Sequence, residues 1–131
     1  MPSPPQPIVR RLEDGPWEGW PADQVAQRGA VTWKDLFGGD AAAGTNMVMG
    51  VVRVRRGESL EPHRHSEPEA YHTLVGEGVV RVEDRQIPVR PGVAIYIPAD
   101  ALHGITNAHD ADLTILYTFA VGSWDQVVYR F

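Results

Sequence analysis

The stretch from Gly57 to Gly76, GESLEPHRHSEPEAYHTLVG, decides both the fold and the chemistry that we predict for this chain. It contains His63 and His65 with one residue between them, and Glu69 follows after a short turn. In a β-strand, residues i and i+2 project from the same face, so the two imidazoles can point at one position. The pattern therefore predicts two histidines and a carboxylate gathered at one place on a β-structure.

This residue set indicates a metal site. Two neutral imidazoles and a carboxylate form a mixed nitrogen and oxygen ligand set that suits a divalent first-row metal. A fourth ligand is available at His103, further along the chain. We expect one divalent transition metal ion, Fe, Mn, Ni or Zn, because imidazole and carboxylate ligands accept all of these.

Composition limits the other possibilities. The chain has 131 residues, a length that suits one domain. Its formal net charge is −5 and it has no basic run, so neither nucleic acid nor a membrane is expected as its partner. It has no cysteine, which excludes disulfides and thiolate ligands. The sequence shows no signal peptide and no long apolar segment, and we expect a cytoplasmic protein.

Short β-type runs separated by turn residues continue through most of the chain, and no convincing helical period is present. The clearest runs are 46–55, 71–75, 79–83, 93–97 and 113–119, with a tail of β character at 124–131. This spacing predicts an all-β sandwich or barrel. We expect residues 31–131 to form the barrel and residues 1–30, rich in proline and tryptophan, to form an N-terminal arm that packs on the barrel or on a partner subunit.

The spacing of two motifs resembles that of the cupin superfamily. The first runs Gly57-x5-His63-x-His65-x3-Glu69-x6-Gly76, and the second runs Gly92-x5-Pro98-x-Asp100-x2-His103-x3-Asn107. Asp100 stands where the family usually has glycine, in a turn. The resemblance implies a jelly-roll barrel, also called a double-stranded β-helix, with His63, His65, Glu69 and His103 as the metal ligands.

A narrower resemblance is to the small single-domain cupins that include dimethylsulfoniopropionate lyases. It rests on Tyr71, which lies two residues after Glu69, and on similarity at 31–34 and 124–131. In those lyases the equivalent tyrosine is the proposed general base that removes the proton α to the carboxylate. The resemblance implies that Tyr71 is a catalytic base and that the metal holds a substrate carboxylate.

Three further residues are candidates for binding the substrate. Tyr96 and Tyr117 lie on predicted strands at positions that should face the cavity, and either could contact a substrate with its ring. Arg53 could point inward from its strand and bind a substrate carboxylate, or it could lie on the surface. His72 has the opposite strand parity to Tyr71 and should point away from the metal.

The same residues leave three functions open. The first is a metal-dependent lyase that acts on a small carboxylate. The second is a metal-dependent dioxygenase, because three histidines and one glutamate also suit Fe(II) and O₂. The third is a non-catalytic barrel that binds a small molecule. By analogy with other small cupins, we also expect a homodimer.

Overall fold

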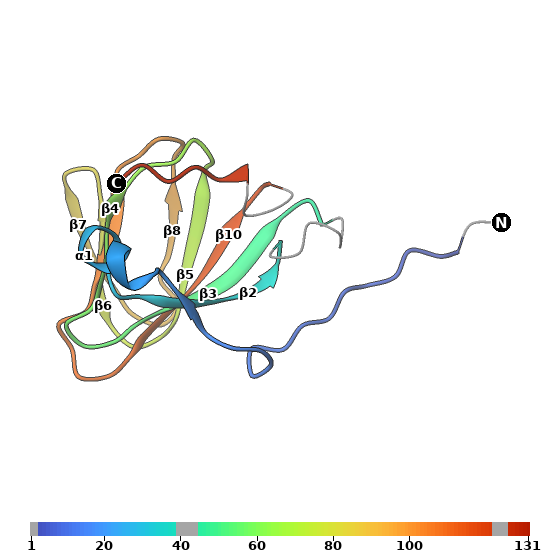
Figure 1. Cartoon of the computed structure of the whole chain (residues 1–131), viewed down its shortest axis with the longest axis horizontal. Helices are drawn as coiled ribbons and strands as arrows, with labels where there is room; N and C mark the ends of the chain where they lie inside the picture. The colour runs from blue at the N-terminus through green and yellow to red at the C-terminus, as the bar shows by residue number, and fades with distance from the viewer. Residues whose placement is uncertain (1–2, 39–44, 122–125) are drawn as a thin grey trace.

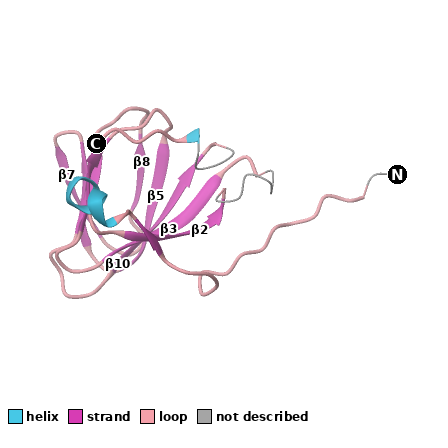
Figure 2. Ribbon diagram, viewed as in Figure 1, coloured by secondary structure: helices cyan, strands magenta, loops and turns pink. Residues whose placement is uncertain are grey.

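The computed structural model describes residues 3–38, 45–121 and 126–131, and in these ranges the chain is almost entirely β-structure (Figures 1 and 2). One short 3-10 turn and one short helix, η1 and α1, precede the barrel. The elements are β1 (Glu18–Gly19), η1 (Ala22–Gln24), α1 (Val25–Arg28), β2 (Thr32–Phe37), β3 (Val48–Val54), β4 (Ser59–His63), β5 (Glu69–Val75), β6 (Gly78–Val82), β7 (Arg85–Val89), β8 (Ala94–Ile97), β9 (His103–Thr106) and β10 (Leu113–Phe119).

The strands form two antiparallel sheets that face each other. One sheet has the order β1-β2-β3-β10-β5-β8, and the other has the order β4-β9-β6-β7. Neighbours in each sheet include strands distant in sequence, such as β3 beside β10 and β4 beside β9. This two-sheet arrangement is a jelly-roll barrel, and it confirms the predicted all-β fold.

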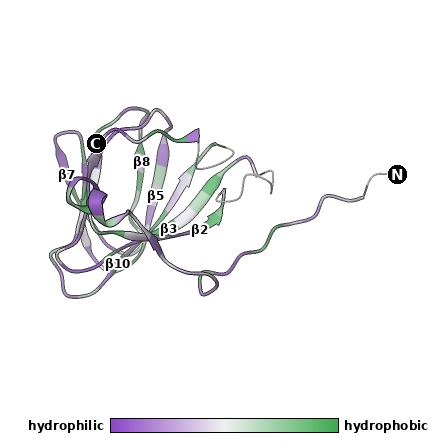
Figure 3. Cartoon of the chain, viewed as in Figure 1, coloured by the Kyte–Doolittle hydropathy of each residue, from purple (hydrophilic) through white to green (hydrophobic). Residues whose placement is uncertain are grey.

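Alternation along the strands places the core between the sheets. On β10, Leu113, Ile115, Tyr117 and Phe119 are buried, whereas the residues between them are only partly buried. A strand with one apolar face and one mixed face is expected where a sheet covers a core on one side. Figure 3 shows green hydrophobic stretches along β3 and purple hydrophilic residues on helix α1.

The turn that contains Asp100 adopts the conformation that glycine would favour. Asp100 has a φ of 62°, in the left-handed region that aspartate tolerates better than most residues. Its backbone N–H donates a hydrogen bond to the carbonyl of His65 at 2.9 Å. The substitution at this motif position therefore keeps the turn that connects the strand ends near the histidines.

The N-terminal segment has two parts. From Trp17 onward it packs on the barrel: β1 pairs with β2, and the ring of Trp17 lies 4.1 Å from the guanidinium carbon of Arg53. The start of the described chain, in contrast, extends away from the barrel in Figure 1, and residues 3–7 are exposed. Ile8 and Arg10 line a pocket together with Leu36 and Phe37 of β2. None of the helices in the described ranges has the length and apolar character needed to cross a membrane.

The C-terminal segment pairs with the backbone between His63 and His65. Within 126–131 the predicted β character is limited to a single bridge, in which the backbones of Arg64 and Arg130 exchange two hydrogen bonds of 2.8 Å. Residues 124 and 125 of the predicted tail lie outside the described residues. This bridge brings Tyr129 and Phe131 next to His63, whose ring centre lies 5.4 Å and 4.9 Å from theirs.

Candidate metal centre and its cavity

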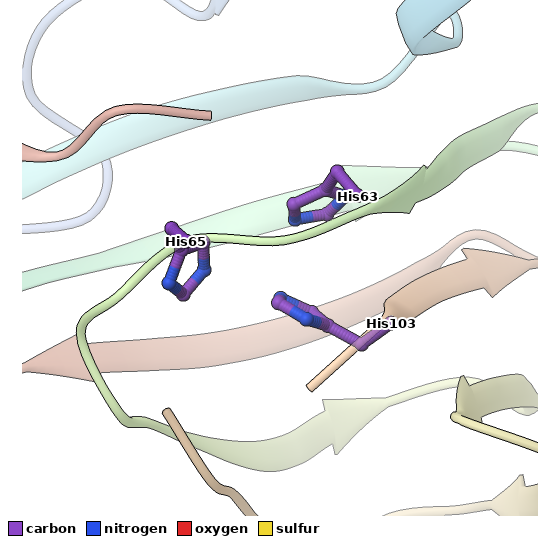
Figure 4. A group of neighbouring side chains, drawn as sticks. All are labelled: His63, His65 and His103. Atoms are coloured by element: carbon purple, nitrogen blue, oxygen red, sulfur yellow. The ribbon is translucent and has the colours of Figure 1, made fainter. Parts of the chain in front are cut away.

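Four buried residues from three strand ends and one loop come together inside the barrel. His63 is the last residue of β4 and lies opposite His103, the first residue of β9. His65 follows two residues after His63, and Glu69 begins β5. Figure 4 shows the three imidazoles pointing toward one another, and all four side chains are at most 5% exposed.

The ligand atoms of this cluster are close enough to share one ion. One nitrogen from each of the three histidines lies within 4.8 Å of the other two. One carboxylate oxygen of Glu69, Oε1, lies 3.2 Å from His65 Nε2 and 3.1 Å from His103 Nε2. The structure therefore brings together all four residues that the sequence predicts as ligands.

Backbone carbonyls hold each imidazole in one orientation. His63 Nδ1 lies 2.8 Å from the carbonyl of Glu61, His65 Nδ1 lies 2.8 Å from that of Glu67, and His103 Nδ1 lies 2.9 Å from that of Ala101. A carbonyl can only accept a hydrogen bond, so each Nδ1 carries the proton and donates. The neutral ring then has its lone pair on Nε2, the arrangement that metal-bound histidines usually have.

This arrangement fits a divalent metal ion. The lone pairs of His65 and His103 both point at a carboxylate oxygen, and acceptors facing one another in a buried site need a cation or a proton between them. Burial, followed by the charge of His103, lowers the pKa of His63 to about 3, so this imidazole is neutral at neutral pH and can bind a metal. His63, His65, His103 and Glu69 would hold the ion.

The pKa of His65 moves in the opposite direction. Burial alone would lower it, but the hydrogen bond to Glu69 and the negative charge of that carboxylate outweigh burial and raise the pKa. A metal ion binds only the unprotonated Nε2 of an imidazole, so it competes with protonation of His65. Metal binding at this site therefore weakens as the pH falls, because protonation of the histidines competes with it.

Next to the cluster lies a cavity of about 320 Å³ between the two sheets. Its walls are mainly aromatic and aliphatic, with three carboxylates. The lining residues are Glu18, Trp20, Val31, Trp33, Asp35, Val52, Leu60, His63, Glu69, Tyr71, Tyr117, Val127 and Tyr129.

Two of the predicted tyrosines line this cavity. Tyr71 is 3% exposed, and its ring centre lies 6.1 Å from that of His103. Tyr117, opposite Tyr71 on the neighbouring strand, donates a hydrogen bond to Asp35 Oδ1 at 2.8 Å. Burial is the main reason that the pKa of each phenol lies above its ordinary value, with nearby carboxylates adding to the effect.

Tyr96 and Arg53 lie outside the cavity, which corrects the expectation that they line it. Ile97 pairs with Glu69, so the opposite parity places Tyr96 on the outer face of the sheet, where it is 69% exposed. Arg53 also lies on an outer face, where it stacks on Trp17 and donates a hydrogen bond to Thr32 Oγ1 at 3.2 Å. His72 is exposed on the outer face of β5, as its parity predicts.

Sequence reasoning missed three polar residues of the cavity, Glu18, Asp35 and Tyr129. The ring of Tyr129 lies 5.4 Å from the ring of His63 and 5.4 Å from that of His65. Asp35 reaches the cavity from β2. Strand parity within 31–37 could have placed Asp35 on the same face as Trp33, but no local pattern predicts the bridge that brings Tyr129 to the histidines.

Comparison with known proteins identifies the family to which the chain belongs. The sequence profile of the cupin domain family matches residues 50–119, which contain all four candidate ligands. The chain belongs to the cupin family.

Among relatives of known function, the chain is similar to a dimethylsulfoniopropionate lyase of Ruegeria pomeroyi, with 43% identity over 103 residues that cover 79% of this chain and 67% of the relative. It is also 27% identical to an oxalate-binding protein of Thermotoga maritima over 90 residues, 68% of this chain and 74% of that protein.

Solved structures of other proteins have the same fold as this chain. A protein of Thermotoga maritima described as a predicted oxalate decarboxylase superposes with a TM-score of 0.74 at 23% identity, covering 87% of this chain and 99% of that one. The polyketide cyclase RemF of Streptomyces resistomycificus gives 0.72 at 24% identity, covering 87% and 79%. At these identities the similarity concerns the barrel alone.

We predict that His103→Ala loses the metal. The substitution removes one of four ligands from a buried site, and metal content should fall from about one equivalent to about a tenth or less, since each ligand contributes to affinity. Elemental analysis after loading measures this, and added metal should no longer raise the melting temperature.

His72→Ala is the matched control, because this imidazole lies on the outer face of β5 and should leave metal content unchanged. Full metal occupancy in a folded His103→Ala protein would remove this residue from the ligand set.

Proposed function

We propose that this cupin is a metal-dependent lyase that acts on small carboxylates with a leaving group on the β-carbon, dimethylsulfoniopropionate being the first substrate to test. The observation that carries this proposal is the position of Tyr71, which shares a cavity wall with Glu69 beside the three imidazoles. The name of the 43% identical relative supports the same reaction class.

The reaction is a β-elimination. A base removes a proton from the carbon next to the carboxylate, a double bond forms between the α- and β-carbons, and the carbon–sulfur bond breaks. The electron pair of that bond leaves with sulfur, so the products are acrylate and dimethyl sulfide. No oxidant is consumed, which separates this function from that of a dioxygenase.

His63, His65, Glu69 and His103 would hold the metal. When bound, the metal would bind the substrate carboxylate and make the adjacent proton more acidic by withdrawing charge. The protein's own part is to orient the substrate: the aromatic walls surround a partly open space of about 320 Å³, a volume that suits a small organic acid.

Tyr71 is the proposed base. Its side chain projects from the same face of β5 as Glu69, two residues earlier, so its hydroxyl can approach a substrate held beside Glu69. Burial, then the negative charge of Glu69 and the nearby Tyr129, raise the pKa of Tyr71 in the metal-free protein. A phenol in this state keeps its proton at neutral pH. Its action as a base therefore depends on a nearby cation that favours the phenolate.

We predict that Tyr71→Phe lowers turnover of dimethylsulfoniopropionate by about 10²-fold or more, the usual contribution of a general base, while metal content stays the same. Released dimethyl sulfide, measured by gas chromatography, reports turnover. Tyr96→Phe makes the same chemical change on the outer face and should keep the wild-type rate.

If Tyr71→Phe turned over the substrate at the wild-type rate, another group would have to be the base. Repeating the wild-type assay without oxygen tests the reaction class, because a lyase keeps its full rate under these conditions and a dioxygenase does not.

We also propose that the N-terminal arm packs on a second copy of the chain and that the protein is a homodimer. The start of the arm extends away from its own barrel (Figure 1), residues 3–7 are exposed, and the apolar side chain of Val9 is 74% exposed. Proline-rich segments are stiff and extended, so this arm can reach a neighbouring barrel with a small loss of conformational entropy.

Deleting residues 3–11 should convert the dimer to a monomer, because it removes the proposed contact and leaves β1 onward in place. Light scattering after size-exclusion chromatography measures the mass. A wild-type protein with the mass of a single chain, or a deletion variant that remains a dimer, would contradict the proposal.

A further inference from the structure

The last described segment, residues 126–131, forms a wall of the cavity although it lies outside the strands of both sheets. Its side chains alternate as they do in a strand. Val127 is buried, Tyr129 and Phe131 are partly buried, and the residues between them are exposed. Val127 and Tyr129 line the cavity. The segment therefore has an inner face toward the metal centre and an outer face toward solvent.

The inner face of this segment lies against two of the predicted metal ligands. The ring centre of Tyr129 lies 5.4 Å from that of His63 and 5.4 Å from that of His65, and the ring centre of Phe131 lies 4.9 Å from that of His63. Rings at these separations are packed against one another. An ion held by the histidines would be shielded on this side by the two aromatic side chains.

The backbone pairing that attaches the segment to the barrel is short. It consists of one bridge, in which Arg64 and Arg130 each donate an N–H to the carbonyl of the other at 2.8 Å. The ladder between β10 and β3, in contrast, pairs every residue from Leu113 to Phe119. A pairing of one residue has little stability of its own, so side-chain contacts decide how firmly the segment lies on the barrel.

Asp100 supplies such a contact on the outer face. Arg130 Nη2 donates a hydrogen bond to Asp100 Oδ1, and the two side chains form an ion pair. The backbone of Asp100 is itself tied to the ligand-bearing loop: its N–H donates to the carbonyl of His65 at 2.9 Å, and its carbonyl accepts from Arg64 Nη1 at 2.9 Å. The carboxylate is therefore held beside the bridge, where it can keep Arg130 in place.

The backbone conformation of Asp100 indicates that its side chain has a role of its own. Its φ of 62° lies in the left-handed region, which glycine adopts freely and a residue with a Cβ adopts only with strain. Among the described residues other than glycine, only Glu83 also has a positive φ. Glycine would serve the turn better, so the carboxylate must contribute something that the turn does not need.

We propose that Asp100 is a positioning residue that holds residues 126–131 against the metal centre through Arg130 and thereby slows exchange of the bound metal. An incoming ligand can approach the imidazoles from this side only after the segment has opened locally and the two rings have moved away. A firmly held segment therefore slows loading and release of the metal alike. The inference needs the metal centre but goes beyond the proposed lyase reaction.

The test measures metal exchange in the full chain with Co²⁺, whose visible absorbance follows binding. Stopped-flow mixing gives the rate of loading and the rate of release to excess EDTA. We expect Asp100→Asn to raise both rates about two- to fivefold, because the side chains of Arg130 and Asp100 are 57% and 61% exposed and exposed ion pairs have effects of this size. The dissociation constant should stay unchanged, since loading and release are accelerated equally.

Two further variants separate the carboxylate from the turn. Asp100→Gly relieves the backbone and removes the side chain, so it would leave exchange unchanged if Asp100 served the turn alone; we expect exchange at least as fast as in Asp100→Asn. Arg130→Gln removes the other partner and should have a similar effect, and combining it with Asp100→Asn should add little. Asp110→Asn is the matched control, because it disrupts an exposed ion pair with Arg56 at the opposite end of β9 from His103 and should keep the wild-type rates.

Wild-type exchange rates in both Asp100 variants would overturn the inference. A weaker dissociation constant with an unchanged loading rate would overturn it as well, because the substitution would then disturb the ligands and not the segment. A wild-type protein that binds no Co²⁺ would overturn it together with the metal centre. If exchange accelerates as expected in a protein that does not turn over dimethylsulfoniopropionate, the inference stands and the lyase proposal fails.

Discussion

Three hydrogen bonds from histidine Nδ1 to backbone carbonyls determine what this barrel can do. They use the peptide groups of Glu61, Glu67 and Ala101 to fix the ring orientation of His63, His65 and His103. Each imidazole then presents its Nε2 lone pair to the interior, where the carboxylate of Glu69 is already buried. Such a cluster of acceptors is costly without a cation, so the fold favours metal binding through its backbone geometry.

The rest of the cavity follows from the register of the large sheet. Pairing of β5, β10, β3 and β2 places Tyr71, Tyr117, Gly50 and Asp35 in one row. A shift of one residue in any of these pairings would turn a member of the row to the outer face, because side chains alternate with period two. Tyr71 and Asp35 are thus held at a fixed separation along the cavity wall by the same backbone hydrogen bonds that form the sheet.

Local spacing was enough to predict that His63, His65, Glu69 and Tyr71 face one interior position, because parity can be followed along the chain from the end of β4, through a short loop, to the start of β5 in the other sheet. The parity of β8 could not be followed in the same way, since the turn before it sets the register. Tyr96 was therefore assigned to the wrong face.

The position of a bound metal ion tests the proposed metal centre most directly. Crystals of the metal-loaded protein, with diffraction data collected at the absorption edge of the metal, locate the ion directly by its anomalous signal. We expect a single ion bonded to Nε2 of His63, His65 and His103 and to the carboxylate of Glu69. An ion bound through Nδ1, an ion at another position, or a loaded crystal without an anomalous peak among these residues would contradict it.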